Sequence, residues 1–131
     1  MQIDADHLRD ALNEDREFRI HARYWSAQFR VVTDTQTLLV KLIEGNVVAV
    51  DPGATPFDGW DFQLAGTNKQ WAALLAPVPP PFFQDYYCAM LYHGFRIEGD
   101  MKMIMAYYPA VRRTREVLRQ VVVVGSQSVA A

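Results

Sequence analysis

The sequence predicts a single α+β domain, and three observations carry that prediction. The chain has 131 residues, which is close to the commonest length of one domain and too short for two. Half of these residues are hydrophobic, and a chain of this length can bury one core. The hydrophobic pattern changes from helical spacing to the alternation of strands near residue 28, and returns to helical spacing near residue 67. We expect one domain over residues 1–120, followed by a C-terminal tail or edge strand over 121–131.

Two short helices open the predicted fold. Asp4 or Asp6 can cap the first, because an aspartate accepts hydrogen bonds from the free N–H groups of an opening turn. In the second, Phe18, Ala22 and Trp25 recur at i, i+4 and i+7, so they share one face that we expect to be buried.

Four strands should follow, in the order of an antiparallel meander. Apolar residues alternate with others through these segments, as in a strand with one buried face. Gly45 and Asn46, between two such runs, are typical of a hairpin turn. The predicted strands cover residues 28–33, 38–43, 47–50 and 60–64.

Two more helices are predicted in the second half of the chain. Thr67 or Asn68 can cap the first, which is short. The second should begin at Phe82, carry aromatic residues and Met90 at helical spacing, and stop at Gly94.

A short strand and the longest helix close the predicted fold. Residues 95–97 alternate as a strand, and Asp100 can cap the helix that follows. Pro109 removes a backbone donor inside that helix, so we expect a kink or break near residues 105–108.

With its elements in this order, the sequence resembles the sterol carrier protein 2 family, in its free-standing bacterial form. The resemblance spans residues 18–119, and it rests on three ordered stretches and on the helix between the last two. These stretches are LLVKLIEGNVVAVDPG (38–53), WDFQLAGTNKQWAALLAP (60–77) and FRIEGDMKMIM (95–105).

The resemblance implies an α+β fold with a five-stranded, mainly antiparallel sheet, covered by helices, and an apolar tunnel between sheet and helices. It also implies a ligand drawn from fatty acyl chains, acyl-CoA esters, sterols and similar lipids. We therefore expect the chain to bind a fatty acyl, sterol or isoprenoid-like molecule in an internal hydrophobic cavity. It would then carry this ligand, or present it to a partner enzyme.

Methionines and aromatic residues supply candidate walls for that cavity. Methionine is unbranched and polarizable, so it adapts to varied ligands, and tyrosine adds a flat surface with one polar end. Ordinary core packing explains the same pattern, so the ligand role depends on the resemblance. Arg112 and Arg113 can meet a phosphate or carboxylate head group, although a solvated helix face explains them as well. The candidate ligand-binding residues are Trp25, Phe82, Phe83, Tyr86, Tyr87, Met90, Leu91, Met101, Ile104, Met105 and Tyr108.

Composition argues against several other classes of protein. The net charge is −2 with no long run of one sign, so no nucleic-acid partner is expected. The chain has no stretch of 18 apolar residues and opens without a secretory signal, so we expect a cytoplasmic protein that does not span a membrane. Cys88 is the single cysteine and the three histidines lack spaced carboxylate partners, so neither a metal site nor a cofactor is assigned.

No catalytic residue is assigned, because the chain has no Ser-His-Asp order, P-loop, GxGxxG or HExxH motif. A small cavity enzyme stays an alternative: an isomerase, hydratase or cyclase on a hydrophobic substrate, with Asp85, His93 or Tyr107 as acid or base. A third hypothesis is a module that dimerises through the helix over 82–92. The closing position of the longest helix favours the carrier, and both a monomer and a homodimer stay open.

Overall fold

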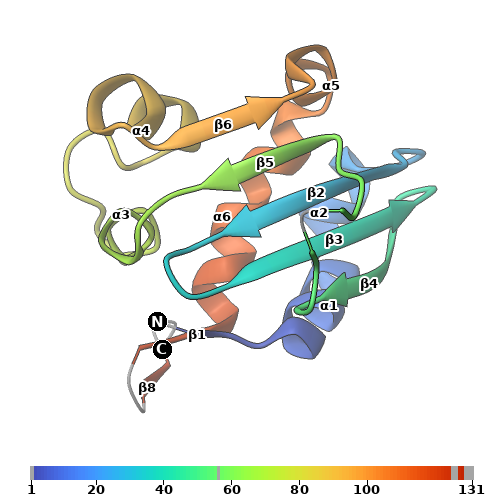
Figure 1. Ribbon diagram of the computed structural model, residues 1–131, viewed down its shortest axis with the longest axis horizontal. Coiled ribbons are helices and arrows are strands. Elements are labelled where there is room, and N and C mark those ends of the chain that lie inside the picture. The colour runs from blue at the N-terminus through green and yellow to red at the C-terminus, as the bar shows by residue number, and fades with distance from the viewer. Residues whose placement is uncertain (1, 56, 125–126, 129–131) are drawn as a thin grey trace.

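Five strands form the central sheet of the computed structural model, which describes residues 2–55, 57–124 and 127–128 (Figure 1). They are β2 (Ala27–Val32), β3 (Thr37–Ile43), β4 (Asn46–Asp51), β5 (Phe62–Ala65) and β6 (Arg96–Gly99). Their order across the sheet is β4-β3-β2-β5-β6, with β2 and β5 parallel and the other three neighbouring pairs antiparallel. The sheet is therefore mixed and mainly antiparallel, in agreement with the predicted α+β fold.

The described residues form six helices, and these surround the sheet unevenly. They are α1 (Ala5–Glu14), α2 (Arg16–His21), α3 (Asn68–Leu74), α4 (Tyr86–His93), α5 (Met101–Ala106) and α6 (Tyr108–Val121). Helices α1, α2 and α6 cover one face of the sheet, whereas α4 and α5 lie near the two ends of the edge strand β6 (Figure 1). The edge of the sheet at β6 is thus flanked by the two helices that carry most of the predicted ligand-binding residues.

A second, small sheet joins the two ends of the chain. In it β7 (Val122–Val124) lies between β1 (Gln2–Ile3) and β8 (Gln127–Ser128), antiparallel to both. Of the segment predicted as a tail or edge strand, residues 122–124 and 127–128 are therefore strands, and they belong to this small sheet. Residues 125–126 and 129–131 lie outside the described residues.

The hydrophobic core lies between the central sheet and the helices on its covered face. Phe29 in β2 and Phe62 in β5 are paired in the parallel register, so their side chains point to the same face of the sheet. Both belong to the core, so this is the covered face. Val117 and Leu118, from the buried stripe of α6, belong to the same core cluster. All four side chains are at most 2% exposed. Burying a side chain of this size stabilises the fold by about 1.5–3 kcal/mol.

The predicted helix ends agree with the structure at several positions. The Asp4 side chain accepts a hydrogen bond from His7 N at the start of α1, and Asp100 does the same for Met103 N at the start of α5. Gly94 follows α4 in the left-handed conformation, with φ 73°, where glycine is free of the penalty that a Cβ brings.

The predicted break in the C-terminal helix is also confirmed. Helix α5 ends at Ala106 and α6 begins at Tyr108, so Tyr107 separates them. Pro109 then lies in the first turn of α6. The N–H groups of a first turn have no partner inside the helix, so a proline is tolerated there although it would disrupt a helix interior.

The predicted four-strand meander is wrong at its last strand. Strand β5 does not pair with β4; it lies parallel to β2, with Phe29 opposite Phe62 and Val31 opposite Leu64. The connection over 52–61 is long enough to pass from one edge of the β4-β3-β2 unit to the other. This position lets Phe62 and Leu64 extend the buried face of β2, which accounts for the observed pairing.

Two helix boundaries also differ from the prediction. Helix α4 begins at Tyr86 rather than Phe82, because the prolines before Phe82 lack N–H groups and Phe82 itself has φ 66°. Helix α2 ends at His21, so Trp25 lies beyond it. It lies in a turn where its backbone N–H donates to Ala22 O at 2.9 Å. Trp25 is nevertheless buried, as its spacing from Phe18 predicts.

Candidate ligand-binding site

Four aromatic rings lie nearly parallel between the sheet and the break that separates α5 from α6. The Trp25 ring lies 4.8 Å from Tyr107, 6.0 Å from Phe62 and 6.2 Å from Phe29, measured between ring centroids, with interplanar angles of 10° or less. Phe29 and Phe62 are themselves 5.0 Å apart. We call this group of four the ring stack. It brings side chains of β2, β5, the α2–β2 turn and the helix break into one apolar layer.

Polar contacts join the start of α4 to the start of α6. The Tyr108 hydroxyl donates to Asp85 Oδ1 at 2.5 Å and accepts from Tyr87 N at 3.3 Å. Asp85 stands at the cap position of α4 but makes no capping hydrogen bond with its side chain. Its carboxylate is instead turned toward Tyr108, so this contact fixes α4 against the helix break.

A second contact between the same helices is fully buried. The Tyr86 hydroxyl donates to Thr114 Oγ1 at 2.8 Å, since the Thr114 hydroxyl itself donates to Val111 O at 2.6 Å. Burial raises the pKa of Tyr86, and burial together with the Asp85 carboxylate raises the pKa of Tyr108. Both phenols therefore stay protonated at neutral pH and act as hydrogen-bond donors rather than as bases.

Exposed apolar side chains occur on α4, on α5 and at Phe82 before α4. Leu91 is 60% exposed and Met105 is 51% exposed, and the other members of the group are exposed to a similar or smaller degree. We call this group the edge surface, because α4 and α5 lie near the two ends of the edge strand β6 (Figure 1). Its members are Phe82, Tyr87, Leu91, Tyr92, Met101 and Met105.

The structure divides the eleven predicted ligand-binding residues among three environments. Trp25, Tyr86 and Ile104 are fully buried. Phe83, Met90 and Tyr108 are half-buried against the core. Those on the edge surface are Phe82, Tyr87, Leu91, Met101 and Met105. The predicted residues therefore range from the exposed edge surface to Trp25, which is buried in the ring stack.

Four hollows open at the surface of the described residues, and three of them lie away from α4 and α5. One, between α3 and the start of α4, is mainly apolar and includes the predicted residue Phe83 beside Pro80 and Ala73. The ring of His93 is stacked on Phe83 at 4.0 Å there, and its Nε2 is 2.9 Å from Pro81 O. The tunnel that the sequence led us to expect between sheet and helices is not among these four hollows.

The overall arrangement of the helices and strands is similar to that of several solved structures. The crystal structure of sterol carrier protein 2 has a TM-score of 0.69 to this chain at 16% identity, over 89% of this chain and 94% of the other. A conserved hypothetical protein of Thermus thermophilus, described as possibly a sterol carrier protein, has a TM-score of 0.70 at 16% identity, over 97% and 94%. The chain has the sterol carrier protein 2 fold.

The UbiJ-SCP2 ubiquinone synthesis protein shares this fold at greater distance. Its TM-score is 0.54 at 15% identity, over 86% of this chain and 87% of the other. By sequence, no family model and no curated protein matches the chain. The likeness therefore lies in the fold, and it confirms the architecture that the sequence predicts.

Several residues of the candidate site were not predicted from the sequence. Phe29 and Phe62 complete the ring stack with Trp25 and with Tyr107, which the sequence offered only as a possible acid or base, and Thr114 is the partner of Tyr86. A signal existed for the two phenylalanines, because both hold inward positions in predicted strands. Thr114 carried no such signal, since a threonine within a basic helix is ordinarily solvated.

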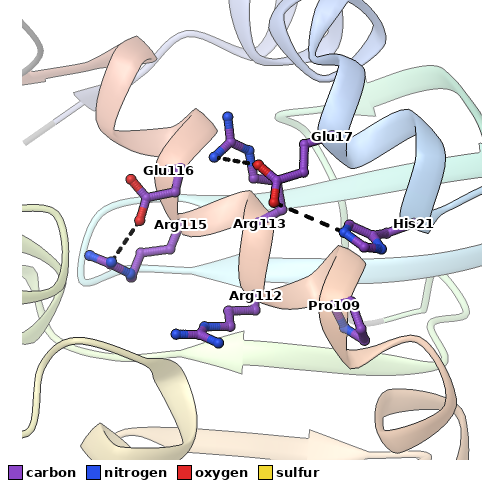
Figure 2. A pocket seen from close by; sticks show the side chains of 7 residues that line it. All are labelled: Glu17, His21, Pro109, Arg112, Arg113, Arg115 and Glu116. Carbon is purple, nitrogen blue, oxygen red and sulfur yellow. Dashed lines mark hydrogen bonds and ion pairs between the residues drawn. The ribbon is translucent and has the colours of Figure 1, made fainter.

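A charged groove between α2 and α6 is one of the four hollows (Figure 2). Its volume is about 390 Å³, which is within the range of small-molecule sites. Its side chains are mostly ionised, so an apolar ligand would lose affinity by desolvating them. The groove is lined by Glu17, His21, Pro109, Arg112, Arg113, Arg115 and Glu116.

Ion pairs within the protein already engage most of the groove's arginines. Arg113 makes two 3.0 Å contacts with the Asp15 carboxylate and one of 3.0 Å with Glu17. Arg115 contacts Glu116 at 2.6 Å. Arg112 stands apart from these pairs in Figure 2. Of the two arginines that the sequence suggested for a head group, Arg113 thus serves mainly to hold α6 against the start of α2.

Replacing Asp15 by asparagine should lower the free energy of unfolding by about 1–2 kcal/mol at pH 7, because hydrogen bonds to a charged group are strong. The Arg113 hydrogen bonds hold the pKa of Asp15 below its ordinary value. A lowered folded-state pKa stabilises the protein above the unfolded-state pKa of about 3.9, and this contribution disappears as the pH falls through the folded-state value. Urea titrations of both proteins between pH 2 and pH 7 should therefore converge at the acidic end.

Asp10→Asn is the matched control, since Asp10 also contacts an arginine, Arg9, at 3.1 Å but is well exposed. The free energy of unfolding of this control variant should stay within about 0.5 kcal/mol of the parent value at every pH. A difference between Asp15→Asn and the parent protein that persists at pH 2 would contradict the electrostatic explanation.

The part of the chain that the structure describes contains neither a metal-binding cluster nor a membrane-spanning helix. Across the described ranges, no three His, Cys, Asp or Glu side chains gather as a metal ion would require. None of the described helices combines the length and the hydropathy that a membrane span needs.

Proposed function

We propose that the chain binds an apolar small molecule, such as a fatty acyl chain, a sterol or an isoprenoid, and carries it or presents it to a partner. The edge surface is the observation that carries this proposal. Exposed apolar side chains grouped on one side of a protein indicate a binding site more often than chance exposure. Here they come from α4, from α5 and from Phe82 before α4, at the two ends of the edge strand β6.

The sterol carrier protein 2 fold supports the same proposal. Two of the solved structures with this fold are described as a sterol carrier protein or possibly one. Lipid or sterol binding is thus the function that the fold suggests, and the edge surface supplies this chain's own residues for it.

The chemistry of these side chains suits a ligand without many polar groups. Burying one methylene stabilises a complex by about 0.8 kcal/mol, so ten methylenes contribute about 8 kcal/mol. That gain can offset the several kcal/mol of freedom lost on binding. Methionine side chains such as Met90, Met103 and Met105 are unbranched, so they change rotamer at a lower cost than branched side chains. They can therefore adjust to ligands of different shape.

The break at Tyr107 supplies a route by which the interior can open. Helix α5 has only six residues, which is too short to be stable without its packing. Movement of α5 about Tyr107 would expose Ile104 and the ring stack to a ligand bound first on the edge surface. The Asp85–Tyr108 contact holds α4 to the start of α6 while α5 moves.

Native purification followed by extraction with organic solvent and mass spectrometry tests the proposal. We expect a lipid or isoprenoid at close to one molecule per chain. A protein that contains no such molecule, and that does not bind palmitic acid or cholesterol in titrations, would refute the proposal. A protein without ligand that is dimeric until the edge surface is made polar would favour the dimerisation hypothesis instead.

Paired variants separate binding at the edge surface from general effects of surface polarity. The double substitution of Leu91 and Met105 by glutamine should weaken palmitic acid binding about tenfold or more, since both would lose apolar contact with the ligand. The control is the double substitution of Ile43 and Val48 by glutamine, because these residues on the β3–β4 hairpin are similarly exposed, at 57% and 50%. We expect the control pair to bind as the parent protein does.

A further inference from the structure

A strained turn precedes α4 in the sequence PPFF (80–83). Phe83 N donates to Pro80 O at 3.0 Å, and Phe82 has φ 66°. A proline at the second position and a positive φ at the third are the marks of a type II turn, whose third position usually holds glycine. A phenylalanine there costs about 1–3 kcal/mol, and strain of this kind is concentrated at functional sites.

The turn directs its two phenylalanine rings onto the last two residues of α4. Phe82 stacks on Tyr92, and Phe83 stacks on His93, each with 4.0 Å between ring centroids. The His93 ring is also held by Pro81 O, which accepts a hydrogen bond from Nε2 at 2.9 Å because a carbonyl has no proton to donate. The first ring pair belongs to the edge surface, and the second lines the hollow between α3 and the start of α4. The strained turn therefore joins the edge surface to this hollow.

The hollow between α3 and the start of α4 contains one cation without a partner. Its volume is about 430 Å³, which is within the range of small-molecule sites. The Gln70 amide accepts from Thr67 N at 2.9 Å and donates to His93 O at 2.7 Å, so it is engaged within the protein. Lys69 also lines the hollow, but it joins none of the ion pairs among the described residues. The lining includes no acidic residue, so the Lys69 ammonium group is free to pair with an anion.

We propose that this hollow binds the head of the carried ligand, and that the head is a carboxylate paired with Lys69. The chain of the ligand leaves the hollow past Phe83 and lies on the edge surface beside Phe82 and Tyr92. This inference rests on the proposed function and narrows it, because the preferred ligand is an acid with an apolar body rather than a neutral lipid. Lys69 is exposed, so the ion pair adds only a few-fold to the affinity and the apolar contacts supply the rest.

Two probes with the same chain test the ion pair. They are decanoate and 1-decanol at pH 7.5, which differ in the charge of the head. Their dissociation constants are measured by isothermal titration calorimetry for the parent protein, Lys69→Gln and Lys102→Gln. We compare the ratio of the two constants within each protein, because an effect on the chain alone cancels in that ratio. Lys102 is the control, since it is also exposed and lies on α5, at the other end of β6.

The preference for decanoate over 1-decanol should fall about two- to fivefold in Lys69→Gln, the effect of one exposed ion pair. It should stay at the parent value in Lys102→Gln. Raising the salt concentration to about 0.5 M should lower the preference of the parent protein by a similar factor, because salt screens exposed charges.

A second pair of variants tests the hollow itself. Ala73 lines the hollow and is half-buried, whereas its neighbour Ala72 is exposed and is not part of the lining. A phenylalanine at position 73 would occupy space that the ligand needs, so Ala73→Phe should weaken both probes about tenfold, the effect of displacing roughly two methylenes. Ala72→Phe should bind both probes as the parent protein does. The lysine variants, which change no core packing, decide the question if Ala73→Phe does not fold.

Each of the following results would overturn the inference. A ratio that is unchanged in Lys69→Gln, or that falls in Lys102→Gln instead, would place the head of the ligand elsewhere. Equal binding by Ala73→Phe and Ala72→Phe would mean that the hollow stays empty. If neither probe binds the parent protein but solvent extraction still yields a lipid, the inference fails and the proposed function stands. If neither probe binds and no lipid is extracted, both fail.

Discussion

Replacing Trp71 by alanine should lower the free energy of unfolding by about 3–5 kcal/mol, the range for removing a large buried aromatic side chain. Trp71 is 0% exposed, and its ring meets Phe95 at 5.2 Å and Tyr86 at 5.9 Å, in both cases edge to face. Tyr86 lies in α4 and Phe95 directly precedes β6, so these elements would have to shift to close the space that the indole leaves. Domains of this kind are stable by only about 5–15 kcal/mol, so the loss should be visible directly in thermal or urea unfolding.

Trp71→Phe separates the ring from its hydrogen bond in the same position. This variant keeps most of the packing and loses the donor to Val32 O. That carbonyl still accepts from Gly66 N at 3.0 Å, so it is not left unpaired, and we expect a loss of only about 1 kcal/mol. If the phenylalanine and alanine variants were equally unstable, the hydrogen bond and not the packing would be the main contribution of Trp71.

Signals that act over a few residues made the helices predictable. The side chains of Asp4, Asp100 and Thr67 accept hydrogen bonds from the opening turns that follow them, as the sequence indicated. Gly94 ends α4 and Pro109 lies just after a break for reasons that hold in any protein. In each case the deciding contact lies within four residues of the signal, so no knowledge of the rest of the fold was needed.

The position of β5 could not be predicted in the same way. Alternation identifies Phe62 and Leu64 as residues with one buried face, but either edge of the β4-β3-β2 unit could receive them. The choice depends on contacts far apart in sequence, between Phe62 and both Phe29 and Trp25. The ring stack follows from that same choice, so the sequence supplied its members without placing them together.

The candidate site shows the same limit. Helical spacing grouped the methionines and aromatic residues of α4 and α5, but spacing alone does not reveal whether a face is turned inward or outward. Leu91 and Met105 proved to be exposed, whereas Ile104 is fully buried. Asp85 illustrates the point with a polar residue, because it stands where a helix cap is expected and contacts Tyr108 instead.

Replacing Gly99 by alanine should lower the free energy of unfolding by about 2–6 kcal/mol, and it should also disturb the ring stack. Gly99 has φ 115°, a conformation that residues with a Cβ rarely adopt. A Cβ at this position would lie 2.5 Å from Asp61 O and 2.6 Å from Phe62 Cα. Backbone strain of this kind costs about 1–3 kcal/mol, and crowding of a well-packed region costs a similar amount.

The direction of the displacement makes this variant informative about the site. Gly99 is paired with Phe62 across β5 and β6, so relief of the clash must push β6 away or shift Phe62 against Trp25. The tryptophan fluorescence of the folded variant should therefore change, along with its stability in urea. The control is Gly59→Ala, because a Cβ at Gly59 meets nothing within 4 Å and should alter stability by less than about 1 kcal/mol. Equal stability of the two variants would mean that β6 adjusts freely, and the edge of the sheet beside α4 and α5 would then be more mobile than its close contact with Phe62 indicates.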